Sequence, residues 1–128
     1  MDVMAELRSI GALFTAGDFS SGSVRLRDLW GKVPEPKTAT PNSYLIIEYA
    51  VTFALKTGNL DEAQRWADLA PEFTKVRQDM GEVEFLIGKV AFERGDYEAA
   101  KRNFELANIK SEGRSFQGKD PKYKQLIQ

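Results

Sequence analysis

The sequence contains neither cysteine nor histidine among its 128 residues. Disulfides, thiol nucleophiles, the usual zinc sites and imidazole acid–base chemistry each require one of these two residues. The chain also carries no recognised serine-nucleophile motif. These absences predict a protein that is not an enzyme and that has no catalytic residue, metal site, cofactor or small-molecule substrate.

Long apolar runs and a large net charge are also missing. The longest apolar stretch, residues 44–55, is interrupted by Glu48 and Thr52 and is too short to span a bilayer. The chain starts with Asp2 and Glu6 where a signal peptide has basic residues. With 18 basic and 19 acidic residues, the net charge of −1 gives no overall attraction to nucleic acid or membrane. We therefore expect a cytoplasmic protein that binds neither.

The residues that are present form a repeat. Three turn signals recur as AGDF around Gly17, TGNL around Gly58 and RGDY around Gly95, and they lie 41 and 37 residues apart. Apolar residues at helical spacing flank each signal, each glycine can stop a helix, and the Asp or Asn after it can cap the next. The pattern predicts one all-α domain, 1–128, with helix pairs at approximately 3–31, 43–71 and 77–110 and a short capping helix at 119–127.

The third unit, GEVEFLIGKVAFERGDYEAAKRNFELA, resembles the tetratricopeptide repeat (TPR). Its signature positions hold Gly88, Ala91, Gly95, Asp96, Tyr97, Ala100, Phe104 and Ala107. The two earlier units match at fewer positions, because Val51, Ala67 and Ile10 replace the usual residues. The resemblance implies a right-handed solenoid that binds other proteins, with Gly88 and Ala100 allowing two helices to cross closely.

In this family the first helix of each pair lines the concave, partner-facing surface. The register implies these partner-binding residues: Phe14, Leu45, Glu48, Thr52, Leu55, Glu82, Phe85, Lys89 and Phe92. Two arrangements stay open, an exposed groove and a groove filled by the terminal helix. Glu48 lies in an apolar stretch and must meet a cation or water, and Lys89 is the expected partner.

Residues 31–42, GKVPEPKTATPN, separate the first two pairs and hold three of the five prolines. Prolines at these positions prevent a regular helix. The segment is therefore either a stiff connector or a loop that contacts a partner.

Two functions follow from these observations. The tail GKDPKYKQLI resembles small stand-alone repeat proteins of bacterial polymorphic-toxin loci, which implies an immunity protein that neutralises a cognate toxin. Residues 42–100 hold eleven acidic and six basic residues, a balance that suits a basic partner such as a nuclease toxin. The alternative is a generic TPR adaptor or scaffold for assembly of a protein complex, including one that forms a homodimer.

Overall fold

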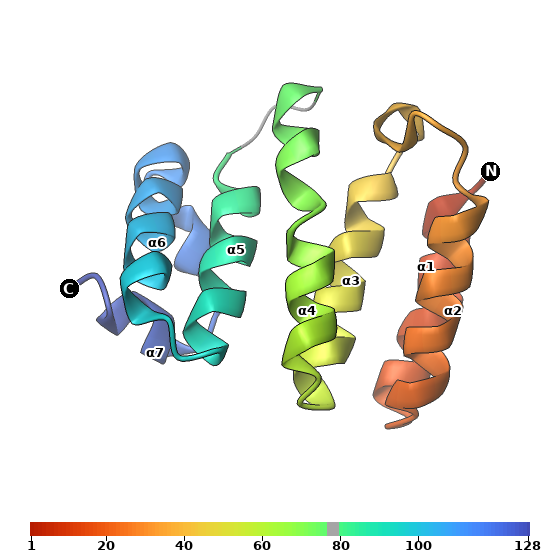
Figure 1. The fold of residues 1–128 in the computed structure, drawn as a ribbon, viewed down its shortest axis with the longest axis horizontal. Helices are drawn as coiled ribbons and strands as arrows, with labels where there is room; N and C mark the ends of the chain where they lie inside the picture. Colours follow the sequence, from red (N-terminus) through yellow and green to blue (C-terminus); the bar gives the residue numbers. More distant parts are fainter. Residues whose placement is uncertain (77–79) are drawn as a thin grey trace. The chain divides into compact units, whose positions relative to one another are not determined.

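The structure is a computed structural model of the chain, and it describes residues 1–76 and 80–128. All regular secondary structure in those residues is helical (Figure 1), which confirms the predicted all-α class. The α-helices are α1 (Val3–Thr15), α2 (Phe19–Lys32), α3 (Ser43–Lys56), α4 (Leu60–Ala67), α5 (Glu82–Glu93), α6 (Tyr97–Ser111) and α7 (Pro121–Gln125). Three short 3-10 helices are η1 (Lys37–Ala39), η2 (Ala70–Lys75) and η3 (Arg114–Phe116).

The chain divides into two compact units, residues 1–72 and 73–128. The first, unit 1, contains the two helix pairs α1/α2 and α3/α4, and α1 and α2 both pack against α3. The second, unit 2, contains the pair α5/α6 together with η3 and α7. The predicted start of the third pair at residue 77 lies outside the described residues. The organisation of the chain as one domain stays a prediction.

The predicted turns between the paired helices are confirmed. Gly17, Gly58 and Gly95 have φ values of +78°, +73° and +85°, a conformation that glycine adopts without strain. In each turn the following residue caps the next helix, because its side-chain oxygen accepts a hydrogen bond from a backbone N–H three residues on. The capping residues are Asp18, Asn59 and Asp96.

Two glycines allow close contact between helices. A Cβ atom on Gly22 of α2 would lie 2.0 Å from Cε1 of Phe53 on α3. A Cβ on Gly88 of α5 would lie 2.7 Å from Cδ1 of Phe104 on α6. The close crossing expected at Gly88 is therefore present in unit 2, and unit 1 has a tighter one at Gly22.

The proline-containing segment is anchored at both of its ends. The Nζ of Lys37 donates hydrogen bonds to the backbone oxygens of Trp30 and Val33, at 2.6 and 2.9 Å. Trp30 lies in the last turn of α2 and Val33 directly follows the helix, where backbone carbonyls lack the regular donor four residues on. At the other end, the Ser43 hydroxyl donates to the Lys37 backbone oxygen at 2.7 Å. These contacts favour the interpretation of the segment as a stiff connector.

Aromatic rings form much of the core of unit 2. Phe85 of α5 packs against Phe104 of α6, and Phe116 of η3 and Tyr123 of α7 pack against both rings. The ring centroids in these contacts are 5.2–5.9 Å apart. The predicted terminal helix is thus present, and it covers the core of its own unit.

Candidate protein-binding surface

A pocket of about 380 Å³ lies between α1 and α3 in unit 1. Because positions three or four apart share one face of a helix, each helix presents a short stripe of residues to it. Three lining residues, Phe14, Glu48 and Thr52, belong to the partner-binding set predicted from sequence. The full lining is Gly11, Phe14, Glu48, Tyr49, Thr52 and Phe53. We call this feature the Glu48 pocket.

The floor and one wall of the Glu48 pocket are aromatic. The buried ring of Phe53 lies 5.3 Å from the ring of half-buried Phe14, in an edge-to-face arrangement. The Phe53 ring fits here because Gly22 has no side chain, since a Cβ there would overlap the ring. Gly11 also lines the pocket, and a Cβ there would meet no atom within 4 Å. The missing side chain at Gly22 thus makes room for the Phe53 ring, whereas the space beside Gly11 is not filled by any other residue.

Glu48 supplies the charge in the pocket. The residue is half-buried, and its backbone oxygen accepts a hydrogen bond from the Thr52 hydroxyl at 2.9 Å. Within the described part of the chain, the Glu48 carboxylate forms neither a hydrogen bond nor an ion pair. The expected partner, Lys89, belongs to unit 2, and this pairing stays a prediction.

The predicted binding residues of unit 2 are placed differently. Phe85 is 5% exposed and lies in the core beneath Tyr123, so it contributes to folding and not to a free surface. The half-buried ring of Phe92 packs against Tyr97 and Tyr123, at centroid distances of 5.1 and 5.2 Å. Within unit 2, the terminal helix thus covers this face of α5. The other predicted residues, Leu45, Leu55, Glu82 and Lys89, are half-buried.

The contact between α5 and α7 also contains charged and polar groups. The Tyr123 hydroxyl donates to Oε1 of Glu93 at 2.8 Å, and Lys122 Nζ lies 2.8 Å from the same oxygen. Burial alone would raise the pKa of Glu93, but the hydrogen bonds from Lys122 and Tyr123 outweigh it and the pKa is lowered. Burial, together with the bond to Glu93, raises the pKa of Tyr123.

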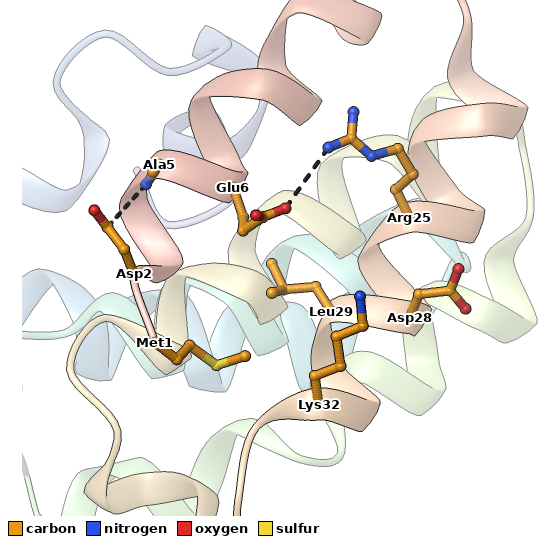
Figure 2. Close-up of a pocket in the computed structure, with 8 residues that line it drawn as sticks. All are labelled: Met1, Asp2, Ala5, Glu6, Arg25, Asp28, Leu29 and Lys32. Atoms are coloured by element: carbon orange, nitrogen blue, oxygen red, sulfur yellow. Dashed lines mark hydrogen bonds and ion pairs between the residues drawn. The ribbon is translucent and has the colours of Figure 1, made fainter.

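A second pocket, of about 310 Å³, lies between α1 and α2 (Figure 2). Its charges are mixed: Glu6 and Arg25 approach to 3.7 Å, and Asp2 accepts a hydrogen bond from the backbone N–H of Ala5 at 3.0 Å. Asp28 and Lys32 of α2 add one charge of each sign. Because acids and bases are present together, this pocket has no dominant charge.

A third pocket, of about 400 Å³, lies between α2 and α4. Trp30 and Trp66 meet there edge to face at 5.7 Å, and Arg27 pairs with the buried carboxylate of Glu62 at 2.6 Å. This site was not predicted from the sequence. The available signal is that the two tryptophans are 36 residues apart, close to the length of one repeat.

Other site types have little support in the described residues. No group of three or more Asp or Glu side chains there is arranged to hold a metal ion. The buried carboxylate of Glu84 pairs with Lys110, which gives it a structural role. None of the helices described is both long enough and apolar enough to cross a membrane.

Comparisons of the chain with models of known protein families, with curated proteins and with solved structures found no match. The resemblance to the tetratricopeptide repeat therefore stays a prediction, and it depends on the signature positions of residues 81–107.

Proposed function

We propose that this chain is a non-catalytic protein-binding module in which TPR-like helix pairs stack as a right-handed solenoid. In this proposal α1 and α3, the first helices of their pairs, carry the partner-binding surface. The observation that carries the proposal is the Glu48 pocket, where Phe14, Glu48 and Thr52 gather from two helices. The resemblance to the tetratricopeptide repeat implies the same grouping, because it assigns all three residues to the partner-facing surface.

The chemistry of the pocket suits a protein partner. Aromatic side chains contribute strongly to the energy of protein interfaces, and they do so where a pocket excludes water. Phe14 and Tyr49 are half-buried in the free chain, so further apolar area is available for burial on binding. A partner that covers these rings gains affinity from that area.

The most concrete form of the proposal is an immunity protein that binds and neutralises a cognate bacterial polymorphic toxin in the cytoplasm. Two features support it, the resemblance of the tail at residues 118–127 and the acidic excess of residues 42–100. A nuclease toxin has a positively charged substrate groove, and complementary charge accelerates association. The carboxylate of Glu48 adds a negative charge to the proposed surface.

A generic adaptor or scaffold is the second candidate. The pocket that contains Trp30 and Trp66 favours it, because Trp and Arg are frequent hot-spot residues and this site lies on a different pair of helices. A chain with two such surfaces can hold two proteins together, including a second copy of itself.

Co-expression with the product of the neighbouring gene separates the two candidates. For an immunity protein, we expect the chain to protect cells from a toxin encoded next to it and to co-purify with that toxin. For a scaffold, we expect a stable complex with a non-toxic neighbour, such as a biosynthetic or secretion protein. A chain that neither protects nor forms a complex with any neighbour would contradict both.

A further inference from the structure

We infer that the Glu48 pocket takes one arginine or lysine side chain of the partner protein, with the Glu48 carboxylate as its counter-charge. The inference rests on the proposed protein-binding function and adds the chemistry of the contact.

Three other buried or half-buried glutamates of the chain form an ion pair with a lysine or arginine. Glu62 and Glu84 are buried, and they pair with Arg27 and Lys110 respectively. Half-buried Glu93 pairs with Lys122. Glu48 is half-buried like Glu93, yet its carboxylate has no ion pair in the described part of the chain. A partner that covers this surface would remove the Glu48 carboxylate from water, and a cation brought by that partner offsets the cost.

Acidic and apolar side chains fit the Glu48 pocket less well than a cation does. An acidic side chain would be repelled by Glu48. An apolar side chain would remove the Glu48 carboxylate further from water and give it no hydrogen bond, which is unfavourable. A cation meets both features of the lining, because it neutralises the charge of Glu48 and also contacts the aromatic rings favourably.

The shape and lining of the pocket fit a long basic side chain. Lys and Arg place their methylene stems along apolar surface while the charged end reaches a polar group. Here the rings of Phe14 and Phe53 offer that surface, and the Glu48 carboxylate meets the charged end. The clear space at Gly11 leaves room for the stem to enter.

Unit 2 contains an intramolecular contact of the kind that we infer for Glu48. Lys122 Nζ lies 2.8 Å from a Glu93 carboxylate oxygen and 5.6 Å from the centroid of the Phe92 ring. A carboxylate and an aromatic ring on α5 thus hold a lysine from another segment, combining an ion pair with a cation–π contact. We infer that Glu48 and Phe14 hold a partner's basic side chain in a similar way.

The first arm of the test measures affinity for the partner that co-expression identifies. We expect Glu48→Gln, which keeps the shape of the side chain, to weaken binding about tenfold or more, since a charge-assisted contact is lost. Gly11→Leu, which fills the space beside Gly11, is expected to weaken it similarly. The matched control is Glu105→Gln, which removes one charge from an exposed position on α6 and should leave affinity unchanged. Glu48→Gln should not lower the melting temperature, because the carboxylate it removes is unpaired.

The second arm needs no partner. N-acetyl-arginine amide and N-acetyl-norleucine amide are titrated against the full chain, and amide shifts of Gly11 and Thr52 are followed by NMR. We expect shifts with the arginine probe only, and none in the Glu48→Gln protein.

The outcomes separate the inference from the proposed function. Unchanged partner affinity in a folded Glu48→Gln protein, or equal shifts with both probes, would overturn the inference and leave the protein-binding function standing. Arginine-specific shifts without any protein complex would overturn the proposed function and support the cation preference of the pocket.

Discussion

Aromatic side chains on the first helices of the pairs in unit 1 and unit 2 differ in how far other segments cover them. On α1 and α3 the rings of Phe14 and Tyr49 stay partly open beside a carboxylate without an ion pair. On α5 the ring of Phe85 is buried beneath Tyr123 of the terminal helix, half-buried Phe92 packs against the same tyrosine, and the neighbouring carboxylate of Glu93 is paired. In unit 2 the terminal helix supplies both an aromatic ring and a cation to α5. In unit 1 Phe19 of α2 packs on Phe14, but no cation of the described residues pairs with Glu48.

The largest effect is expected from removing the cover of unit 2. Tyr123→Ala should destabilise unit 2 by about 3 kcal/mol, because a buried ring and its hydrogen bond to Glu93 are lost. Phe14→Ala in unit 1 should cost less, since Phe14 is only half-buried. Urea unfolding of the two variants measures the difference. Equal losses of unfolding free energy in the two variants would contradict the difference in burial between Tyr123 and Phe14.

The second prediction concerns two glycines of unit 1 with opposite roles. Gly22→Leu should destabilise the protein by about 1–3 kcal/mol or more, because its side chain would overlap the ring of Phe53. Gly11→Ala should instead stabilise it by roughly 0.5–1 kcal/mol, since the position is helical and meets no neighbour. Thermal melting of both variants checks the signs. A stable Gly22→Leu protein would show that Phe53 does not occupy the floor of the Glu48 pocket.

In unit 2, Gly88→Leu provides the corresponding test of the α5/α6 crossing. We expect a loss of about 1–3 kcal/mol, because a side chain at Gly88 would meet the ring of Phe104. Ala100→Leu should act in the same direction, since Ala100 is fully buried in this core. Melting temperatures equal to that of the wild type would contradict the packing of this pair.

The local features of the fold were predictable from sequence because short-range interactions determine them. The helix pair expected over residues 43–71 begins with Ser43–Lys56, which ends where a glycine turn and a capping Asn follow. The resemblance to the tetratricopeptide repeat, and not local spacing alone, implied that Phe14, Glu48 and Thr52 share one surface, and these residues line one pocket. The pattern could not show that Phe85 is covered, because that depends on Tyr123, 38 positions further along the chain. Phe14 and Phe85 look alike in sequence and differ only in what packs on them.

The smallest effect expected is the contribution of Glu93, in unit 2, to the loss of stability at acidic pH. The pKa of Glu93 is lowered in the folded protein, so its contribution to stability is present above the ordinary value of 4.5 and is lost as the pH falls toward the folded value. Glu93→Gln should therefore reduce the loss of stability on acidification below that pH. The control, Glu105→Gln, should unfold with the same acid dependence as the wild type. Identical acid profiles for all three proteins would contradict the role given to the Glu93 contacts.

In the proposed function the open face of α1 and α3, and not the covered face of α5, receives the partner. Amide cross-saturation NMR on the complex with the partner identified by co-expression distinguishes these two faces. We predict transfer to the amides around Gly11, Phe14 and Thr52, with none at Tyr123. Transfer confined to α5 and α7, or to the pocket of Trp30 and Trp66, would contradict the claim.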